Sequence, residues 1–322
     1  MTKRLLIIII CALALCACAF FSIFNSQSSI VNLQSSIATE APLRVAVTSA
    51  THVGFLAALD ALDCIVAVAN PQLVYSLPKE AKYVDIGSDL QPNVEALLMA
   101  KPDVVFVTSY GTQEPAWWKQ VEQFGTKIVV IDEWKETDPL ARAAWIRKVG
   151  EAVHKERAAD SIFNFRRGAY DSIAALCPPT AGPFLMSGQS FRGTWYVPSG
   201  RSFMGQIFKD AGASYVYAED TARGSLPLTI EQALLAFREA DVWVGADVRT
   251  LTELEALDAR HTWFEAYRKG RVYNYLKRST PAGANDFWER GVVCPDEVLD
   301  DVRHILYPDP DYEFHYLSPL TP

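Results

Sequence analysis

The sequence predicts an α/β protein built of two lobes that are joined by one long helix. From Leu43 onwards, short apolar runs alternate with amphipathic stretches, as in chains whose parallel strands are connected by helices. The segment 138–177 interrupts this alternation, because it carries a helical pattern with no strand inside it. The alternation then resumes. We therefore expect two Rossmann-like lobes with parallel sheets and a ligand cleft between them.

Residues 1–17 are typical of a lipoprotein signal peptide. Lys3 and Arg4 precede an uninterrupted apolar run over 5–15, which is too short to span a bilayer. The four residues 15–18, Leu-Cys-Ala-Cys, resemble a bacterial lipobox. Cys18 is the predicted lipidation site because a small residue precedes it, whereas bulky Leu15 precedes Cys16. The alternatives are an ordinary cleaved signal or an N-terminal anchor helix.

Residues 18–42 predict a flexible tether, since they carry little charge and many Ser, Asn and Gln residues. Loss of residues 1–17 removes two of the 30 basic residues and none of the 38 acidic ones, so the net charge moves from −8 to −10. This balance disfavours nucleic acid as a partner. Cys64, Cys177 and Cys294 are widely spaced, which allows at most one disulfide among them and offers no metal-ligand spacing.

The N-terminal lobe is predicted over 43–137. Its strands are expected at 44–48, 65–69, 104–108 and 127–131, with a weaker one at 83–86. Its helices are expected at 53–62, 93–100 and 115–124.

The connecting helix is predicted over 138–177. Asp138 suits the N-cap, Pro139 the first helical position, and Pro178 and Pro179 forbid continuation. A continuous helix of this length would span about 60 Å at 1.5 Å per residue. The alternative is two shorter helices joined near Gly168, because glycine weakens a helix interior.

The C-terminal lobe is predicted over 178–322. Its strands are expected at 184–187, 214–217, 242–245 and 271–274, and its helices at 202–211, 229–237, 251–256 and 295–305. The stretch 188–202 is expected to be a loop.

Candidate ligand contacts follow the predicted strands, because ligands in open α/β sheets bind beyond the carboxyl ends of the strands. The loop 188–202 is rich in glycine, arginine and aromatic residues, a mixture that suits a large, flat, partly anionic ligand. Tryptophans such as Trp243 and Trp263 are expected to pack in the core, whereas Trp195 is harder to bury in its loop of glycine and proline residues. Other candidates have an alternative role: packing or capping for His52, capping for Asp286, and solvation for the arginines. The predicted ligand-binding residues are His52, Tyr110, Arg192, Trp195, Tyr196, Arg201, Arg278, Asp286 and Trp288.

Catalytic and metal-binding motifs are missing from the sequence. It contains no Gly-x-Ser-x-Gly, phosphate-binding Gly-Lys-Ser/Thr loop, His-Glu-x-x-His or Cys-x-x-Cys. The five histidines are dispersed, so a bare zinc or manganese site is not indicated. A metal that is already wrapped in an organic chelate needs no such cluster.

Four phrases carry a resemblance to a known family: residues 94–107, 193–204, 228–244 and 286–301. The chain from Leu43 to about Pro308 resembles the class III periplasmic substrate-binding proteins of ABC importers for ferric siderophores, haem and cobalamin. The second and last phrases look like a Bacteroidetes-type subgroup of lipoproteins.

The resemblance implies a monomeric binding protein without enzymatic activity or cofactor. Its ligand would be an iron chelate, haem or a corrinoid, held in a shallow cleft whose lobes close little. Glu95 and Glu231 would dock onto arginines of an inner-membrane ABC permease, and the lipid would anchor the protein at the periplasmic face of the envelope. Two alternatives remain: a chelate-modifying enzyme using the pairs Asp132–Glu133 or Asp286–Glu289, and a passive scavenger without a permease.

Overall fold

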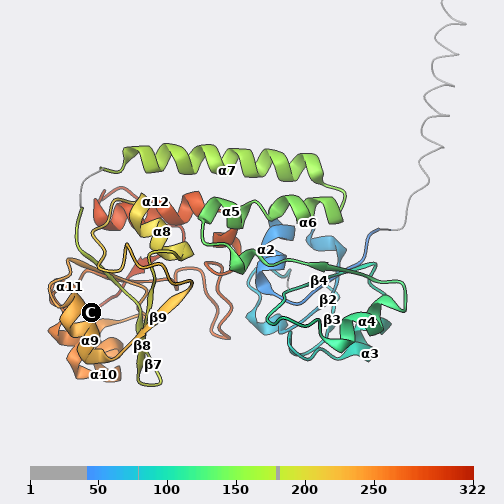
Figure 1. Ribbon diagram of the computed structural model, residues 1–322, viewed down its shortest axis with the longest axis horizontal. Helices are drawn as coiled ribbons and strands as arrows, with labels where there is room; N and C mark the ends of the chain where they lie inside the picture. Colours follow the sequence, from blue (N-terminus) through green and yellow to red (C-terminus); the bar gives the residue numbers. More distant parts are fainter. Residues whose placement is uncertain (1–41, 79, 179–181) are drawn as a thin grey trace, which may run out of the picture. The chain divides into compact units, whose positions relative to one another are not determined.

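The computed structural model describes residues 42–78, 80–178 and 182–322, and residues 43–322 form one compact unit (Figure 1). The predicted signal peptide 1–17, Cys18 and all but the last residue of the predicted tether lie outside the described residues. In the described part, no helix combines the length and the apolar character needed to cross a membrane.

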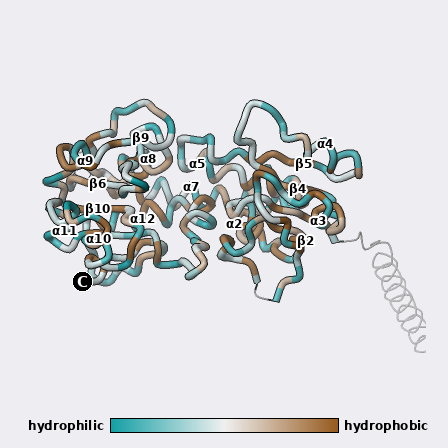
Figure 2. Tube along the Cα trace, turned by 90° about the horizontal axis from the view of Figure 1, so that it is seen from below, coloured by the Kyte–Doolittle hydropathy of each residue, from teal (hydrophilic) through white to brown (hydrophobic). Residues whose placement is uncertain are grey.

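The N-terminal lobe contains a five-stranded parallel sheet with the order β3-β2-β1-β4-β5. Strands β1 and β4 at its centre are buried at every position, as expected for a parallel sheet that is covered on both faces. Figure 2 shows hydrophobic positions concentrated along β2 and β4. The five predicted strands are confirmed as β1 (Val45–Val47), β2 (Ile65–Val68), β3 (Val84–Asp85), β4 (Val104–Val107) and β5 (Lys127–Val130).

Helices cover both faces of this sheet. The helices α2 (Ala50–Ala58) and α3 (Val94–Met99) begin at the N-caps Ser49 and Asn93, whose side chains accept a backbone N–H of the first turn. The remaining elements are α4 (Ala116–Glu122) and the 3-10 helices η1 (Leu62–Cys64), η2 (Pro71–Leu73) and η3 (Glu133–Lys135). The first helix starts three residues earlier than predicted, which places His52 on a helix instead of a loop.

The C-terminal lobe contains two sheets instead of the single parallel sheet that was predicted. The first has the order β12-β11-β10-β6, in which β12 is antiparallel. The second is an antiparallel sheet, β7-β8-β9, and its hairpin occupies the stretch that was predicted to be a loop. The predicted strand at 214–217 is wrong, since Ser214 forms only an isolated bridge with Phe184. The bounds are β6 (Leu185–Ser187), β7 (Gln189–Phe191), β8 (Thr194–Pro198), β9 (Ser225–Leu228), β10 (Val242–Val244), β11 (Val272–Asn274) and β12 (Ser318–Pro319).

The four helices predicted in this lobe are confirmed. Ser202, Thr229 and Thr250 cap the first three with their hydroxyl groups, and the two threonines form capping boxes. The helices are α8 (Phe203–Asp210), α9 (Ile230–Phe237), α10 (Leu251–Leu257) and α12 (Pro295–Leu306), with the unpredicted short elements η4 (Ala259–Trp263), α11 (Glu265–Arg268) and η5 (Arg290–Val292).

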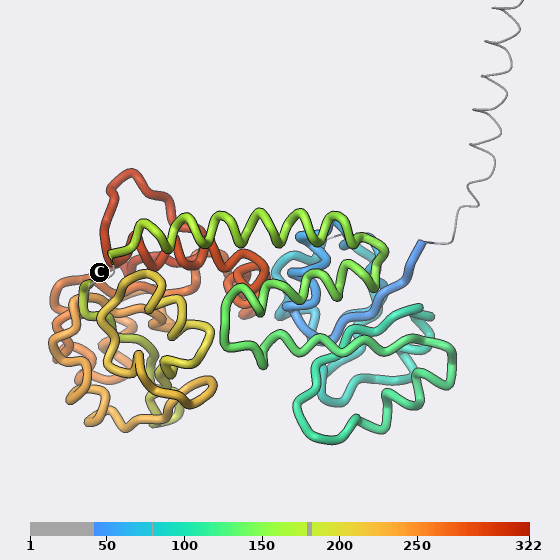
Figure 3. The backbone as a smooth tube through the Cα atoms, turned by 45° about the horizontal axis from the view of Figure 1, so that its top comes forward, coloured from blue at the N-terminus to red at the C-terminus, as the bar shows by residue number. Residues whose placement is uncertain are grey.

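The segment 138–177 is not one continuous helix. It folds as α5 (Pro139–Ala143), α6 (Ile146–Ala152) and α7 (Glu156–Leu176), and its main break lies at His154 rather than near Gly168. His154 adopts φ 58°, and the N–H of Lys155 returns to the carbonyl of Gly150 at 2.7 Å. The chain therefore turns back, so that α7 packs on α6 (Figure 3). With 21 residues, α7 is about 32 Å long at 1.5 Å per residue.

A part of the chain far beyond the predicted division at residue 178 packs against the N-terminal lobe. Val292, Val293 and Cys294 belong to the hydrophobic core that α2, α6 and α7 share with the N-terminal sheet. From there α12 runs back beside α7, where Arg166 forms ion pairs with Asp296 and Glu297 at 3.0 and 2.8 Å. The segment 286–306 is thus a second connection between the lobes. Cys64, Cys177 and Cys294 are all free thiols.

Candidate functional site

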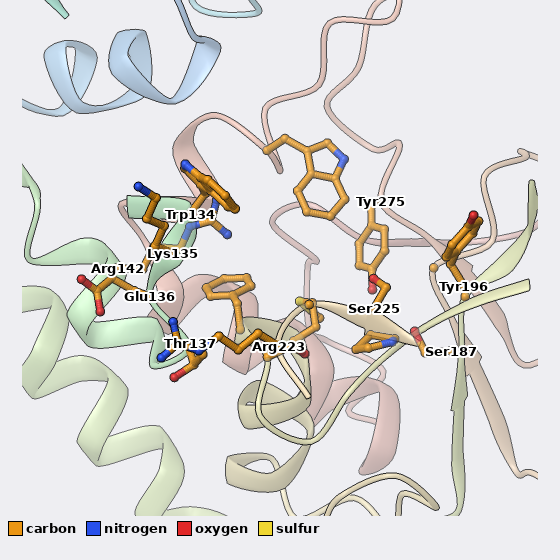
Figure 4. A pocket seen from close by; sticks show the side chains of 18 residues that line it. Trp134, Lys135, Glu136, Thr137, Arg142, Ser187, Tyr196, Arg223, Ser225 and Tyr275 are labelled. Carbon is orange, nitrogen blue, oxygen red and sulfur yellow. The ribbon is translucent and has the colours of Figure 1, made fainter. Parts of the chain in front are cut away.

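A cavity of about 650 Å³ lies between the two lobes, a volume within the range of small-molecule sites (Figure 4). The N-terminal side contributes η3, the two residues that follow it and Arg142 of α5. The C-terminal side contributes the ends of β6, β10 and β11 together with β8, β9 and α8. The lining residues are Trp134, Lys135, Glu136, Thr137, Arg142, Ser187, Gly188, Tyr196, Pro198, Ser202, Phe203, Met204, Arg223, Gly224, Ser225, Gly245, Tyr275 and Trp288.

Aromatic rings form much of the cavity wall. Trp134, Tyr196 and Trp288 line the cavity, and nearly half of the surface of each of these large side chains is exposed. The ring of Tyr275 stacks on Phe287 with 4.1 Å between centroids, and Phe287 meets Trp288 edge-on at 4.6 Å. Rings that are supported from behind and exposed in front suit a flat ligand with a π-face.

Two glycines let the cavity reach the strand ends. Gly245 follows β10 with φ 94°, and a Cβ there would lie 2.8 Å from the ring of Tyr275. Gly188 follows β6 with φ 90°, and a Cβ there would collide with the carbonyl oxygen of Tyr196. Both positions therefore need glycine. They lie at the carboxyl ends of parallel strands, where ligands of α/β sheets bind.

The cavity is lined by three cations and one carboxylate, Glu136. The Nζ of Lys135 is 2.6 Å from the carboxylate of Asp132. Hydrogen bonds from Lys135 and Ser109 outweigh burial and hold the pKa of Asp132 below its ordinary value. Arg223 is exposed and forms no ion pair with any described residue.

Arg142 is the most enclosed cation of the cavity, with 13% of its side chain exposed. Its guanidinium lies 3.4 Å from Glu133 and 5.0 Å from the ring centre of Phe203. Burial lowers the pKa of Arg142 and raises that of Glu133, although the mutual attraction of the two groups opposes both shifts. The Nε of Arg142 and the Oε2 of Glu133 have no hydrogen-bond partner among the described residues. Arg142 lines the cavity and keeps this small part of its side chain exposed, so its guanidinium can bind a further anionic partner there.

Of the predicted ligand-binding residues, the structure brings Tyr196 and Trp288 together in the cavity wall. Tyr110 stands beside it, with its ring centroid 6.1 Å from that of Trp134 and its hydroxyl donating to Asp89.

Trp195 is a correction, because it is fully buried in the core of the C-terminal lobe. Residues of β8 alternate between the two faces of the strand, so Trp195 points inward and Tyr196 points outward. The ring packs against Trp243 and Phe264 at 5.3 and 5.5 Å, and its Nε1 donates to the carbonyl of Ser187 at 3.0 Å. Trp195 thus packs in the core beneath β8, the strand that carries the cavity residue Tyr196.

His52 is also a correction. It is completely buried in the first turn of α2, where burial lowers its pKa to about 3, and its Nε2 is 3.3 Å from the hydroxyl of Thr108. A neutral, enclosed imidazole of this kind packs the core and does not face the cavity.

The remaining predicted contacts lie outside the cavity wall. Arg192 occupies the turn between β7 and β8 with φ 52°, over the ring of Phe191, and Arg201 is exposed before α8. Asp286 is buried 2.7 Å from the Nε of Arg278, whose guanidinium lies over the ring of Tyr75 in the N-terminal lobe. This pair therefore links the two lobes.

The acidic residues that were considered for catalysis also bind other groups of the protein. Asp132 and Glu133 bind Lys135 and Arg142. Glu289 accepts the backbone N–H groups of Tyr75 and Ser76 at 2.7 and 2.9 Å.

The lining residues that were not among the predicted ligand contacts include Trp134, Lys135, Arg142, Phe203, Arg223 and Tyr275. The rule that ligands lie beyond strand ends could have found Trp134 and Lys135 after β5 and Tyr275 after β11. Arg142 was hidden inside the predicted connecting helix, and Arg223 carries no signal.

Residues 45–278 match the family model described as periplasmic binding protein, which covers most of the chain. The chain belongs to the periplasmic binding protein family. The predicted family is confirmed, and so is the prediction that the protein is not an enzyme, since members are solute-binding proteins of ABC importers.

Solved structures agree with this fold. The chain is similar to the periplasmic heme-binding protein HutB of Vibrio cholerae, with a TM-score of 0.66, 15% identity and coverage of 83% of this chain and 99% of that one. It is also similar to a periplasmic heme-binding protein of Pseudomonas aeruginosa, with a TM-score of 0.62, 17% identity and coverage of 88% of this chain and 99% of that one. A third similar structure is the vitamin B12-binding protein BtuF of Vibrio cholerae, with a TM-score of 0.57, 15% identity and coverage of 82% of this chain and 96% of that one. At these identities the likeness concerns the fold, and it confirms the predicted two-lobed α/β architecture.

Two curated relatives are uncharacterized lipoproteins of Methanocaldococcus jannaschii. One is 25% identical over 235 residues, covering 71% of this chain and 54% of the relative. The other is 20% identical over 270 residues, covering 78% and 65%. The chain thus spans about half the length of the first and just under two thirds of the second.

Proposed function

We propose that this protein captures a metal chelate in the cavity between its lobes and delivers it to an ABC permease of the inner membrane. The chelate classes are those of the resemblance: a ferric siderophore, haem or cobalamin. Similar structures named for heme and vitamin B12 support this range. The lipobox at Cys18 and the lipoprotein relatives support a lipid anchor at the periplasmic face.

The observation that carries the proposal is the combination of exposed rings with Arg142. A largely enclosed guanidinium is costly unless its donors are satisfied, and Glu133 reaches that of Arg142 only at 3.4 Å. An anionic group on the ligand would complete the hydrogen bonding of Arg142, while Trp134 and Trp288 would contact the flat part of the chelate. This chemistry favours haem or an anionic ferric siderophore over a corrinoid.

Fluorescence titration of the purified protein with hemin, a ferric tris-catecholate and cyanocobalamin tests this proposal, because Trp134 and Trp288 line the cavity. We expect saturable quenching by one of the two anionic chelates and at least tenfold weaker binding by Arg142→Gln, the loss of one charge-assisted hydrogen bond being worth about 1.5–3 kcal/mol. Arg201→Gln, which changes an exposed arginine outside the cavity wall, should bind as the wild type does. Absence of quenching by all three chelates would refute the proposal.

Delivery to a permease rests on Glu95 and Glu231. Each lies in the first turn of a helix, α3 and α9, and each is exposed. Glu231 already forms an exposed ion pair with Arg260 at 2.8 Å, of a kind that contributes little and is readily exchanged. Charge reversal of both residues should abolish transport and leave chelate affinity intact. If it lowered the affinity for the chelate instead, or left transport unchanged, the docking role of Glu95 and Glu231 would be wrong. A wild type that binds the chelate but supports no transport would be a scavenger without a permease.

A further inference from the structure

Each lobe presents the same pair of side chains on the outward face of a helix. On α3, Glu95 is followed four residues later by Met99, which is 75% exposed. On α9, Glu231 is followed four residues later by Leu235, which is 89% exposed. Residues four apart lie one above the other on a helix, so each lobe carries a carboxylate next to an apolar side chain.

These two apolar residues are not needed by the fold. Helix α3 buries Leu97, and α9 buries Ile230, Ala233 and Phe237 against the lobe, on the faces away from Met99 and Leu235. Among the large hydrophobic side chains of the described residues, Leu235 and Met99 are the two most exposed. Scattered exposed apolar residues are common. Here, however, the two most exposed ones, Met99 and Leu235, each lie four residues after a glutamate, one in each lobe. This shared placement indicates a shared partner.

The C-terminal pair also borders a groove of about 760 Å³. Glu231 and Leu235 line one side of it, and Trp263, half-exposed at the end of η4, lines it as well. An apolar side chain of a partner could enter this groove beside the carboxylate. In each lobe, the helix concerned lies on the side away from α7 (Figure 1).

We propose that Met99 and Leu235 are apolar anchors that act with Glu95 and Glu231 in docking the two lobes onto the periplasmic surface of a membrane permease built of two equivalent halves. This inference rests on the proposed function and adds to it the apolar contacts. Because the pair is duplicated, the partner must present the same complementary site twice, a basic residue beside an apolar pocket. The glutamates fix orientation and partner choice, whereas burial of the anchors supplies much of the affinity.

Binding of the full-length lipoprotein, without added chelate, to its permease and ATPase in nanodiscs tests the inference. The variants are Met99→Ser, Leu235→Ser and the double substitution. Leu257→Ser is the matched control, because Leu257 is an exposed leucine at the end of another helix, α10, of the same lobe. Substitutions at such exposed positions leave folding intact, which unchanged thermal unfolding and unchanged hemin titration would verify.

We expect each single substitution to weaken docking severalfold and the double substitution at least tenfold, with no change for Leu257→Ser. Docking of the double variant with wild-type affinity would overturn the inference, and so would a wild-type dimer that the double variant converts to a monomer. If charge reversal at Glu95 and Glu231 abolishes docking while the serine variants dock normally, only the apolar anchors are refuted. If the wild type binds no permease at all, the proposed function itself fails.

Discussion

Glu289 shows how a single buried side chain holds the two lobes together. Its carboxylate accepts the N–H groups of Tyr75 and Ser76 from the N-terminal lobe, and it is completely buried. Burial raises its pKa from the ordinary 4.5 to about 6, and the neighbouring Asp286 adds to the increase while the two N–H groups oppose it. The folded state therefore binds the proton more tightly than the unfolded state does.

This difference predicts a pH dependence of stability. The contribution of Glu289 is fully present below pH 4.5 and is lost as the pH rises through 6. The free energy of unfolding can be measured by chemical unfolding at pH 4.5 and at pH 7.5. Between these two pH values, the wild type should lose about 2 kcal/mol more than Glu289→Gln does. Glu313→Gln, at an exposed carboxyl, should show no such difference. Parallel pH profiles for the wild type and Glu289→Gln would contradict this account.

Trp195 and Tyr196 are neighbours in the chain with opposite roles. Because Trp195 fills the core, Trp195→Ala should lower the free energy of unfolding by about 3–5 kcal/mol. Tyr196 lines the cavity and is half-exposed, so Tyr196→Ala should weaken chelate binding with little change in stability. Denaturant unfolding and fluorescence titration of both variants check this contrast. The assignment would be wrong if Tyr196→Ala were the less stable of the two.

The same pair of residues shows how far the sequence could predict the site. The stretch 188–202, selected for its aromatic and glycine content, borders the cavity, but it contains a hairpin whose turn is Arg192-Gly193, both with positive φ. Once a strand is present, its alternation decides which side chain faces the ligand. Arg142 could not be predicted, since its position depends on how α5 meets α8 and not on any local pattern.

At the scale of elements, the helical hairpin of α6 and α7 depends on Gly150. A Cβ at Gly150 would lie 2.5 Å from the Cβ of Ala159 on α7 and 3.2 Å from the carbonyl oxygen of Lys155. The two helices therefore approach each other closely only because this position has no side chain. Gly168, in the middle of α7, has no neighbour within 4 Å of such a Cβ.

The two glycines should respond to the same substitution in opposite directions. Gly150→Ala should lower the free energy of unfolding by about 1–3 kcal/mol through overpacking. Gly168→Ala should raise it by about 0.5–1 kcal/mol, because alanine is the better helix former at an open position. Thermal or denaturant unfolding of both variants measures this, and stabilisation by Gly150→Ala would mean that the hairpin packs differently.

The order of strands and helices could largely be read from the sequence, whereas the break in the connecting segment could not. His154 ends α6 in a left-handed conformation without the glycine that usually marks such an end, so the helical pattern continues across the break. The cause lies in tertiary contacts: the Nζ of Lys155 binds the carbonyls of Leu59 and Asp60 after α2. Such contacts leave no periodic signal in the sequence.

At the scale of the whole described unit, the lobes are joined by more than one helix. The helices α7 and α12 pack side by side, and Arg166 of α7 pairs with Asp296 and Glu297 of α12. The segment between Asp286 and Cys294 adds the bonds of Glu289 and places Val292 and Val293 in the N-terminal core. Opening or closing the cavity widely would break these buried contacts together, since they do not lie along a single flexible strand.

The multiple connections predict that the lobes move little when ligand binds. Small-angle scattering of the protein without ligand and with saturating hemin, or the ferric tris-catecholate if that chelate binds, should give superimposable profiles. The Glu289→Gln variant provides a sensitive comparison, because loss of one of the two interlobe N–H bonds should permit more movement in the free state than in the wild type. A clear fall in the radius of gyration of the wild type on loading would show that the lobes hinge despite α7 and α12, and the cavity would then be shaped by closure rather than built in advance.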